Sequence, residues 1–345
     1  MIQDDKISEF AAVAIPTLNR YDHFVRCIES LKKNRYSEYT DLYISLDYAP
    51  NERYENGRKQ IEDYLNRGIH GFAHVYVHKH DKNLGAKNNS DYVMKWVSNS
   101  HERYIFSEDD NEFAPNYLEF VNKLLEQYAN DDCVIAISGY NYPIDTNGTG
   151  EEIYFGSTYF AAFGFAGWFN KLYVMQQRMT ADWIRSIYKD LSFMNELRQK
   201  APNQYCNFIK GMVGYTPLLE NNEEVSKIDL TYGLYMFSYG KKMIFPVLSK
   251  VRNWGYDGSG VNCDVMEYDP QKPVTHRNYG FDCQKLDERA ECVGLKLVSE
   301  SENKAIIDKV NTFFYIPNKE VLRSRLAYVV SRIVGIDTMR KIWKK

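Results

Sequence analysis

The chain has 345 residues, 44% of them hydrophobic, and a formal net charge of −3 at pH 7. The length and apolar content suffice for one large domain or two, and the small net charge excludes a general polyanion-binding role, so we expect no nucleic-acid partner. The N-terminal stretch MIQDDKISEF lacks the apolar core of a signal peptide, and no apolar run approaches the roughly 18 residues that cross a bilayer.

Six cysteines are scattered along the chain, and none of them forms a C-x-x-C pair. This spacing suits neither a zinc ribbon nor a disulfide framework. It indicates reduced thiols, and together with the polar N-terminal stretch it predicts a cytosolic protein.

Short apolar runs alternate with amphipathic segments through the first part of the chain. The predicted strands are residues 11–15, 42–46, 73–77, 103–107 and 133–138. The predicted helices are residues 21–33, 57–66, 86–98 and the segment that follows Pro115. Strands that alternate with helices indicate β-α-β units, so we expect an α/β fold with a mostly parallel sheet.

Polar side chains follow three of these strands. They are Thr17, Asn19 and Arg20 after the first strand, Asp47 after the second, and Glu108, Asp109 and Asp110 after the fourth. Because ligands bind beyond the carboxyl ends of parallel strands, we expect the three groups to open on one edge. Three adjacent carboxylates repel one another, and Mg²⁺ or Mn²⁺ bound jointly with a diphosphate would offset their charge. A solvated acidic turn is the alternative for the triplet taken alone.

The strand ends indicate a nucleotide-diphosphate site without a glycine-rich loop. The sequence has no G-x-G-x-x-G after the first strand and no G-x-x-x-x-G-K-[ST]. Asp47 offers a carboxylate that accepts hydrogen bonds from a base or a ribose. A sugar nucleotidyltransferase would need a glycine-rich loop where this chain has Pro16 and Thr17.

Six segments, in this order, carry a resemblance to a known family. They are AIPTLNRYDHFVRCIESL, SLD, KNLGAKNNSDYVMKW, FSEDDNEFAPNYLEF, FGFAGWFNK and PVLSKVRNWGYDGSGVNC. Together they resemble GT-A fold glycosyltransferases of the family-2-like group that builds bacterial surface polysaccharides, and the acidic segment also resembles the N-acetylglucosaminyltransferase I group. The resemblance implies a GT-A domain over residues 10–270, preceded by a segment 1–9 and followed by a C-terminal extension 271–317.

The resemblance also implies a site for a nucleotide sugar, with a UDP-sugar as the expected donor. The donor-binding residues would be Pro16, Thr17, Asn19, Arg20, Asp47, Gly85, Asn89, Glu108 and Asp109. Within this set, Asp47 would contact uracil or ribose, and Glu108 or Asp109 the sugar or ribose hydroxyls. Asp110 would be the principal ligand of Mn²⁺ or Mg²⁺, which acts as a Lewis acid on the departing diphosphate. An exposed helix residue is the alternative for Arg20, and a plain turn glycine for Gly85.

Inverting transfer needs a carboxylate base that takes the proton of the acceptor hydroxyl. By the resemblance, Asp229 occupies the matching position ahead of a helix, with Glu223 and Glu224 as fallbacks. The alternative for Asp229 is a helix N-cap.

Three further residues would shape the acceptor and sugar pocket. Trp168 lies in FGFAGWFNK, and Asn253 and Gly255 belong to the turn after a predicted strand over residues 243–248. A core tryptophan is the alternative for Trp168. Many relatives have a histidine just after this turn, where the chain reads Gly260-Val261-Asn262; His276 could substitute as a metal ligand, with an ordinary surface histidine as the favoured alternative.

Residues 318–345 form a basic tail. Eight Lys and Arg residues against Glu320 and Asp337 give this segment a net charge of +6, and its apolar residues include Trp343. Basic and apolar residues in one helix favour peripheral contact with an anionic membrane, here the inner face of a bacterial cell membrane. The alternative is a helix packed on the domain or on a second subunit, so a homo-oligomer stays open.

The sequence therefore predicts a metal-dependent inverting glycosyltransferase. It would move a sugar from a nucleotide sugar to a hydroxyl of a glycan or lipid-linked acceptor during synthesis of a surface polysaccharide such as capsule or lipopolysaccharide. The alternatives are a sugar nucleotidyltransferase and a non-catalytic member of the fold that binds sugars or scaffolds an assembly complex.

Overall fold

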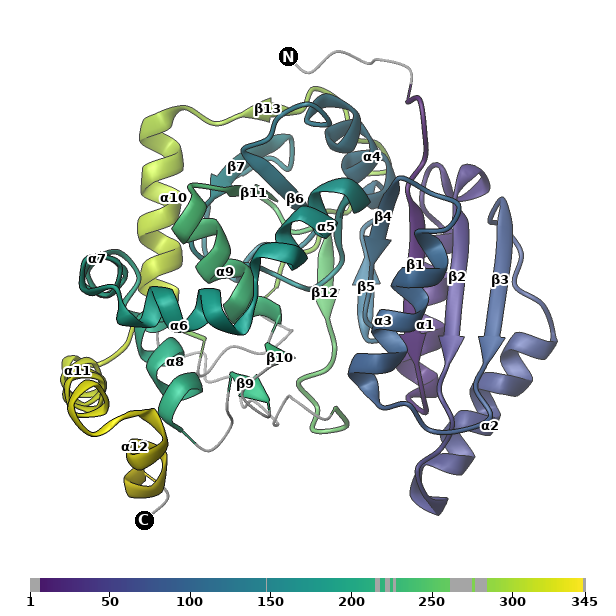
Figure 1. The fold of residues 1–345 in the computed structure, drawn as a ribbon. Helices are drawn as coiled ribbons and strands as arrows, with labels where there is room; N and C mark the ends of the chain where they lie inside the picture. The colour runs from purple at the N-terminus through teal and green to yellow at the C-terminus, as the bar shows by residue number, and fades with distance from the viewer. Residues whose placement is uncertain are drawn as a thin grey trace.

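One nine-stranded sheet organises the computed structural model, which describes residues 7–146, 148–214, 218–220, 224–225, 228–260, 275–276 and 284–343 (Figure 1). Its strands, in spatial order, are β13 (Lys296–Leu297), β7 (Glu152–Gly156), β11 (Lys242–Pro246), β6 (Val134–Ser138), β8 (Phe165–Trp168), β4 (Arg103–Phe106), β1 (Ala12–Thr17), β2 (Asp41–Leu46) and β3 (His74–Lys79). Most neighbouring pairs are parallel; β8 is antiparallel to β4 and β6, and β7 to β11. This confirms the predicted α/β fold with a mixed, mostly parallel sheet.

The N-terminal helices lie between successive strands, as the alternating pattern predicts. They are α1 (Tyr21–Lys32), η1 (Ser37–Tyr39), α2 (Glu52–Asn66), α3 (Ala86–Val97) and α4 (Tyr117–Gln127). Helix α2 begins five residues before its predicted start at residue 57. The reason is local: the Asn51 side chain accepts a hydrogen bond of 3.1 Å from the Arg53 amide and caps the helix.

Strand β8 was not predicted, and it gives Trp168 a different place from the expected one. Trp168 pairs with Arg103, the first residue of β4, whereas the acidic triplet follows the last residue of β4. The Trp168 ring is buried, and the Lys171 ammonium lies 3.8 Å from its centroid. Trp168 is therefore a core residue at the opposite end of β4, which corrects its assignment to a sugar pocket.

A second hydrophobic core joins the middle of the chain to its C-terminal part. Its helices are α6 (Ala181–Lys189), α7 (Leu191–Lys200), α8 (Pro202–Val213), α9 (Ile228–Tyr239), α11 (Asn318–Val334) and α12 (Ile336–Trp343). Helices α5 (Phe169–Arg178) and α10 (Glu300–Phe313) pack on the sheet core, beside β8 and β7 respectively. Helix α8 is central and contacts α7, α9, α11 and α12. In Figure 1, α11 and α12 lie on the side of the molecule away from β3.

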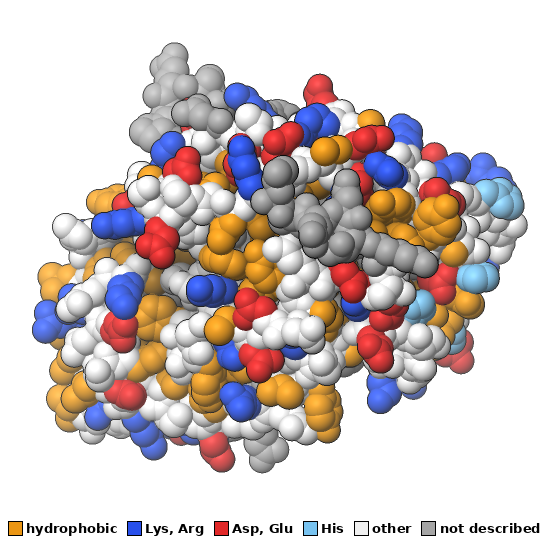
Figure 2. All heavy atoms as spheres, turned by 90° about the horizontal axis from the view of Figure 1, so that it is seen from above, with side chains coloured by type: hydrophobic (Ala, Val, Ile, Leu, Met, Phe, Trp, Pro, Cys, Tyr) orange, Lys and Arg blue, Asp and Glu red, His pale blue; other side chains and the backbone are white. Residues whose placement is uncertain are grey.

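Two surface properties bear on possible partners. Among the described helices, none combines the length and the apolar character needed to traverse a lipid bilayer. Figure 2 shows basic and acidic side chains interspersed over one face, without a field of a single sign. This distribution agrees with the small net charge of the chain.

A small antiparallel pair connects the second half of the chain to the acidic triplet. Strand β12 (Val251–Asn253) pairs with β5 (Asn111–Phe113), so that Asn253 lies opposite Asn111. Just before β12, the buried Lys250 ammonium forms an ion pair with the buried Asp287 carboxylate. This pair fixes the start of β12, and β12 in turn delivers the residues that follow it to the end of β4. Another short pair, β9 (Leu219–Glu220) with β10 (Glu224–Val225), lies between α8 and α9.

Candidate active site

The ends of three neighbouring strands open on the same edge of the sheet. Strand β1 is parallel to β2 on one side, where Thr17 lies opposite Leu46, and to β4 on the other, where Ala14 lies opposite Phe106. The residues that follow these strands are therefore brought together, as expected. They form the core of the candidate site.

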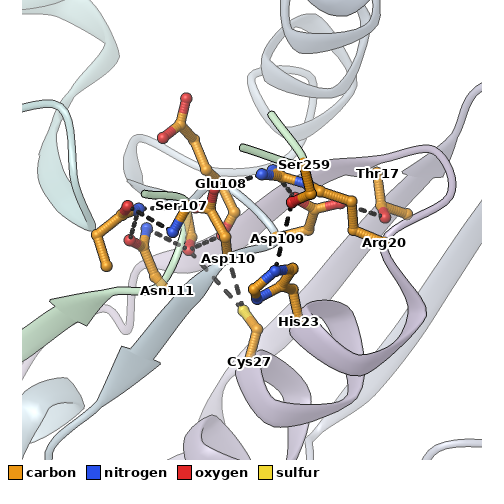
Figure 3. A network of polar contacts seen from close by, with 12 residues as sticks. Thr17, Arg20, His23, Cys27, Ser107, Glu108, Asp109, Asp110, Asn111 and Ser259 are labelled. Atoms are coloured by element: carbon orange, nitrogen blue, oxygen red, sulfur yellow. Dashed lines mark hydrogen bonds and ion pairs between the residues drawn. The ribbon is translucent and has the colours of Figure 1, made fainter. Parts of the chain in front are cut away.

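Arg20 supplies the positive charge that the acidic triplet requires. Its guanidinium forms ion pairs with Asp109 and, at 2.6 Å, with Asp110 (Figure 3). The Thr17 hydroxyl donates a 2.7 Å hydrogen bond to Asp109. Burial raises the pKa of the Asp110 carboxyl, and the Arg20 charge opposes that rise. Burial acts to lower the pKa of Arg20, but both aspartates outweigh it and raise that pKa.

Glu108 differs from the two aspartates beside it. In Figure 3 its carboxyl group points away from Arg20. Burial, together with the negative charges of Asp110 and Asp229, raises the pKa of Glu108 to about 8. Glu108 is therefore mainly protonated at pH 7 in the free protein, and it can donate a hydrogen bond. The charge of Asp229 therefore acts on Glu108.

Asp47 is buried, and protein donors occupy its carboxylate. Its oxygens accept hydrogen bonds from the backbone amides of Tyr48, Leu84 and Gly85, at 2.8, 2.8 and 2.9 Å, and from the Asn83 side chain at 3.1 Å. A carboxylate has about four acceptor positions, so none is left for a base or ribose. This corrects the expected direct contact: Asp47 positions the 83–85 turn, which leads into α3.

Asn89 is likewise a structural residue. Its side chain accepts a 2.6 Å hydrogen bond from the Ser45 hydroxyl and donates to the carbonyls of Ser45 and Thr17, at 3.1 and 3.4 Å. These bonds tie α3 to β1 and β2 inside the protein. Instead of the predicted contact with the donor, Asn89 makes hydrogen bonds that hold the strand ends and α3 together. Gly85 has a φ of 79°, which favours glycine, directly before α3.

Asn253 and Gly255 also lie against Asp110, Asn253 at Oδ1 and Gly255 beside Oδ2. The side-chain nitrogen of Asn253 donates a 2.7 Å hydrogen bond to Asp110 Oδ1, and the side-chain oxygen of Asn253 accepts a 2.9 Å hydrogen bond from the Gly255 backbone amide. A Cβ atom at Gly255 would stand 2.4 Å from Asp110 Oδ2, so this position has no room for a side chain. Both residues therefore act on the acidic triplet rather than on a separate sugar pocket.

The donor atoms around Asp110 fit a divalent cation only if a substrate supplies further ligands. No three His, Cys, Asp or Glu side chains gather as a metal site within the described ranges. Asp110 still has lone pairs, since each oxygen accepts one hydrogen bond, and Gly255 keeps the space beside Oδ2 free of side chain. Mg²⁺ and Mn²⁺ commonly bind one or two carboxylates together with substrate phosphates. The site fits a cation that binds jointly with a diphosphate.

Asp229 lies in the first turn of α9, inside the helix, and is not an N-cap. Its carboxylate makes no hydrogen bond to the described part of the chain. Asp229 reaches solvent, yet the protein around it desolvates the carboxyl and raises its pKa to about 6. Of the fallbacks, Glu224 belongs to β10, and Glu223 lies outside the described residues.

A cavity of about 300 Å³ opens beside Asp229. Aromatic side chains, amide side chains of α8 and His276 line it, together with Tyr256, the residue after Gly255. His276 is thus a half-buried wall residue rather than a surface histidine, and its Nδ1 lies 3.1 Å from the Phe313 carbonyl. The cavity and the acidic triplet are neighbours, because Tyr256 lines the cavity and the preceding residue, Gly255, lies against Asp110.

Tyr48 and Arg58 also lie near the strand ends, and the sequence patterns did not predict them as site residues. Tyr48 follows Asp47 and is 45% exposed, with the Arg58 guanidinium 5.1 Å from its ring centroid. Arg58 also donates a 2.9 Å hydrogen bond to the Asp47 carbonyl. An exposed aromatic ring at the end of β2 offers a stacking surface for a base. The sequence could have indicated Tyr48, because it comes directly after Asp47 at the end of a predicted strand.

Comparison with known proteins identifies a family. The sequence profile of glycosyl transferase family 2 matches residues 12–193, more than half of the chain. No curated protein sequence matches.

Solved structures give only distant similarity. S. aureus TarS is 15% identical, with a TM-score of 0.29 over 38% of this chain and 21% of TarS. The mannosyltransferase PcManGT from Pyrobaculum calidifontis, solved with GDP-Man and Mn²⁺, is 11% identical, with a TM-score of 0.33 over 51% of this chain and 50% of that protein. The chain thus spans half or less of these proteins, and the family assignment rests on the sequence profile.

The Arg20 ion pairs predict a pH-dependent loss of stability. Arg20→Met leaves two buried carboxylates without a counter-charge, so we expect the free energy of unfolding at pH 7 to fall by about 3 kcal/mol. Without Arg20 the folded-state pKa of Asp110 rises further, so the loss should shrink towards pH 4, where that carboxyl is protonated. Urea unfolding followed by circular dichroism at both pH values measures this.

Two further variants test the cause of that loss. Combining Arg20→Met with Asp109→Asn and Asp110→Asn should recover most of the stability. Arg185→Met, which breaks an exposed pair with Asp182, should change it little. An equal loss for Arg20→Met at both pH values would show that Arg20 acts through packing and not through charge.

Proposed function

The chain belongs to glycosyl transferase family 2 and is a glycosyltransferase, and from its site we propose that it transfers a sugar, with inversion, from a nucleotide-sugar donor to an acceptor hydroxyl. One observation carries the proposal. Asp229, a carboxylate that accepts no hydrogen bond from the described residues, stands beside an open cavity and close enough to the acidic triplet to raise the pKa of Glu108. A base, a donor site and room for an acceptor thus adjoin one another.

On the donor side, the diphosphate would meet Arg20 and Asp110. A guanidinium binds phosphate oxygens through two parallel hydrogen bonds, so Arg20 can exchange its carboxylate partners for the diphosphate. Asp110 would hold Mn²⁺ or Mg²⁺ together with that diphosphate, and the cation would offset the charge of the leaving group. Tyr48 offers its ring to the base, and uridine is the nucleotide proposed on the resemblance of the strand-end motifs.

On the acceptor side, Asp229 would act as general base. The acceptor oxygen attacks the anomeric carbon from the face opposite the diphosphate, its proton passes to Asp229, and the bond to the diphosphate breaks with inversion. A pKa of about 6 leaves Asp229 mainly ionised at pH 7. Glu108, mainly protonated at that pH, would donate a hydrogen bond to the donor sugar.

Helix α11 supports a place for this reaction at a membrane. Its inward face, formed by Ser324, Ala327, Tyr328 and Ser331, is buried. An outward stripe consists of Leu322, Leu326, Val329 and Ile333, which are 66, 64, 47 and 79% exposed. Spacings of three and four residues put these aliphatic side chains on one face. Both alternatives for the tail therefore find support, because the helix packs on the domain and also presents an apolar face.

We infer that the α11 stripe contacts an anionic membrane. Exposed basic side chains flank it, namely Lys319, Arg323, Arg325 and Arg332. Aliphatic residues that enter the headgroup region beside basic residues are typical of interfacial helices. The protein would then act at the inner face of a bacterial cell membrane on a lipid-linked or glycan acceptor of surface polysaccharide synthesis. A second copy of the chain is the competing occupant of the stripe.

Donor cleavage tests the proposed function directly. Nucleotide release from UDP-, GDP-, dTDP- and CMP-sugars should occur with one nucleotide class, require Mn²⁺ or Mg²⁺, and stop with EDTA. Asp110→Asn should lower the rate by on the order of 10²-fold or more, because the charge on the leaving group is no longer offset. Asp182→Asn, on the surface of α6, is the matched control. No release and no metal-dependent nucleotide binding with any donor would refute the proposal.

The raised pKa of Asp229 predicts the pH profile of transfer. Only the ionised carboxylate accepts a proton, so kcat/KM should fall about tenfold per pH unit below pH 6 and level off between about pH 6 and pH 8, above which Glu108 loses its proton. The charge of Asp229 acts on Glu108, Tyr142 and Tyr232, and His276 lines the same cavity.

Substitution assigns this acid limb. Asp229→Asn should lower kcat by about 10²–10⁴-fold and remove the limb, whereas Glu224→Gln should keep it. A limb that persists in the residual activity of Asp229→Asn would belong to another group.

The stripe on α11 predicts vesicle binding. The wild-type protein should float with vesicles rich in phosphatidylglycerol, less so at high salt, and not with pure phosphatidylcholine. Leu326→Ser with Ile333→Ser should abolish flotation. Tyr173→Ser with Val174→Ser removes comparable exposed apolar area on α5 and should not. A concentration-dependent dimer that the stripe variant dissociates, without vesicle binding, would assign the stripe to a second copy.

A further inference from the structure

The cavity beside Asp229 has the size and location of a second substrate site. Its volume of about 300 Å³ is at the lower end of small-molecule sites, which span roughly 300–1,000 Å³, so it suits a monosaccharide unit better than a longer chain. Asp229 lines it, and Tyr256 connects it through Gly255 to Asp110. A ligand here would sit between the proposed base and the donor site.

Aromatic rings give one wall of the cavity flat apolar surfaces. Tyr159 and Phe314 are stacked, with ring centroids 4.1 Å apart and an interplanar angle of 14°. Tyr142 meets Phe314 edge-on at 4.9 Å. These rings hold one another in place, so a ligand need not order them on binding. Flat apolar faces that also carry hydroxyl groups suit the C–H face of a pyranose ring.

Helix α8 contributes amide side chains to the lining, next to the aromatic wall. Asn203 accepts a 2.6 Å hydrogen bond from Asn207 and donates to the Phe314 carbonyl at 3.2 Å. Gln204, only 6% exposed, donates to the Thr158 carbonyl at 3.0 Å. The carbonyl oxygens of Asn207 and Gln204 accept no hydrogen bond from the described residues. Asn207 is exposed, and neither oxygen is shut off from solvent, so sugar hydroxyls can reach both oxygens and donate hydrogen bonds to them.

The charge of the lining selects among sugars. Asp229 is its one carboxylate and no Lys or Arg joins it, as far as the described residues show. A phosphate or a uronate in this space would meet the negative charge of Asp229 with no cation to offset it. An uncharged sugar instead finds aromatic faces and amide oxygens.

We propose that this cavity is the acceptor subsite and that it takes an uncharged pyranose, a neutral hexose or N-acetylhexosamine unit at the end of the acceptor. The assignment rests on the proposed function, since it adds the acceptor class to the same site. It names Asn207, Gln204, Tyr142 and Tyr159 as specificity-determining residues. Acceptors that end in a phosphate or a uronic acid are excluded.

Saturation-transfer NMR on the full chain tests the subsite without needing turnover. The probes are methyl β-glucopyranoside and methyl N-acetyl-β-glucosaminide, against glucose 6-phosphate and glucuronic acid. We expect signals from the ring C–H protons of the neutral sugars and none from the anionic ones. Equal or stronger signals from the anionic sugars, or none from the neutral ones, would overturn the assignment, and this comparison needs no variant.

Matched variants locate the binding. Asn207→Asp adds a second carboxylate to the lining and should weaken neutral-sugar binding by about fivefold or more, the effect of at least one lost hydrogen bond. Asn170→Asp makes the same change on the exposed surface of α5 and should leave binding intact. Equal binding by both variants would place the sugar elsewhere.

The donor-cleavage assay separates this inference from the proposed function. Nucleotide release without neutral-sugar binding would overturn the subsite alone. Neutral-sugar binding at the cavity, with neither release from nor metal-dependent binding of any nucleotide sugar, would overturn the proposed function and leave a sugar-binding site.

Discussion

The pairing of Arg20 with Asp109 and Asp110 is the constraint on which the rest of the site depends. Two buried carboxylates at the end of a strand need a positive partner, and Arg20 provides it from the first turn after β1. Asn253 then fixes the other side of Asp110, and Gly255 can approach only because it has no side chain. The site is thus balanced in charge before a donor binds. A diphosphate would bind by forming the ion pairs with Arg20 that the aspartates form in the free protein. Donor binding would therefore change the arrangement of the acidic triplet.

The carboxyls that Arg20 does not pair have diverged in pKa. Glu108 and Asp229 both lie above the ordinary range, but at about 8 and about 6 they fall on opposite sides of neutrality. One is therefore mainly protonated and the other mainly ionised at pH 7. Two carboxyls with separated pKa values can act as hydrogen-bond donor and proton acceptor without exchanging roles. Burial raises both pKa values, and the negative charges of Asp110 and Asp229 raise that of Glu108 further, against the opposing effect of Arg20.

Local patterns predicted which strand ends meet at one edge of the sheet, and long-range contacts decided the rest. The strands before Thr17, Asp47 and Glu108 are short apolar runs, so their existence and their common edge follow from the sequence. Asp47 was expected to face a nucleotide, because a sequence cannot show that the 83–85 turn folds back to occupy its oxygens. Strand β8 was missed for a related reason: four residues with two small ones give no alternation, and only its neighbours β4 and β6 make it a strand.

The two halves of the proposed reaction have different origins in the chain. Arg20 and the acidic triplet lie within the residues that match the family, whereas the amides of α8, the Phe314 ring and Asp229 lie beyond residue 193. A shared donor half with a separate acceptor half lets one chemistry serve many acceptors. Helix α8 joins the acceptor half to the tail, because it lines the cavity with Asn207 and packs against α11 through Tyr205 and Tyr328. A membrane that engaged the outer face of α11 would therefore lie one helix away from the acceptor cavity, which is where a lipid-linked sugar would have to be presented.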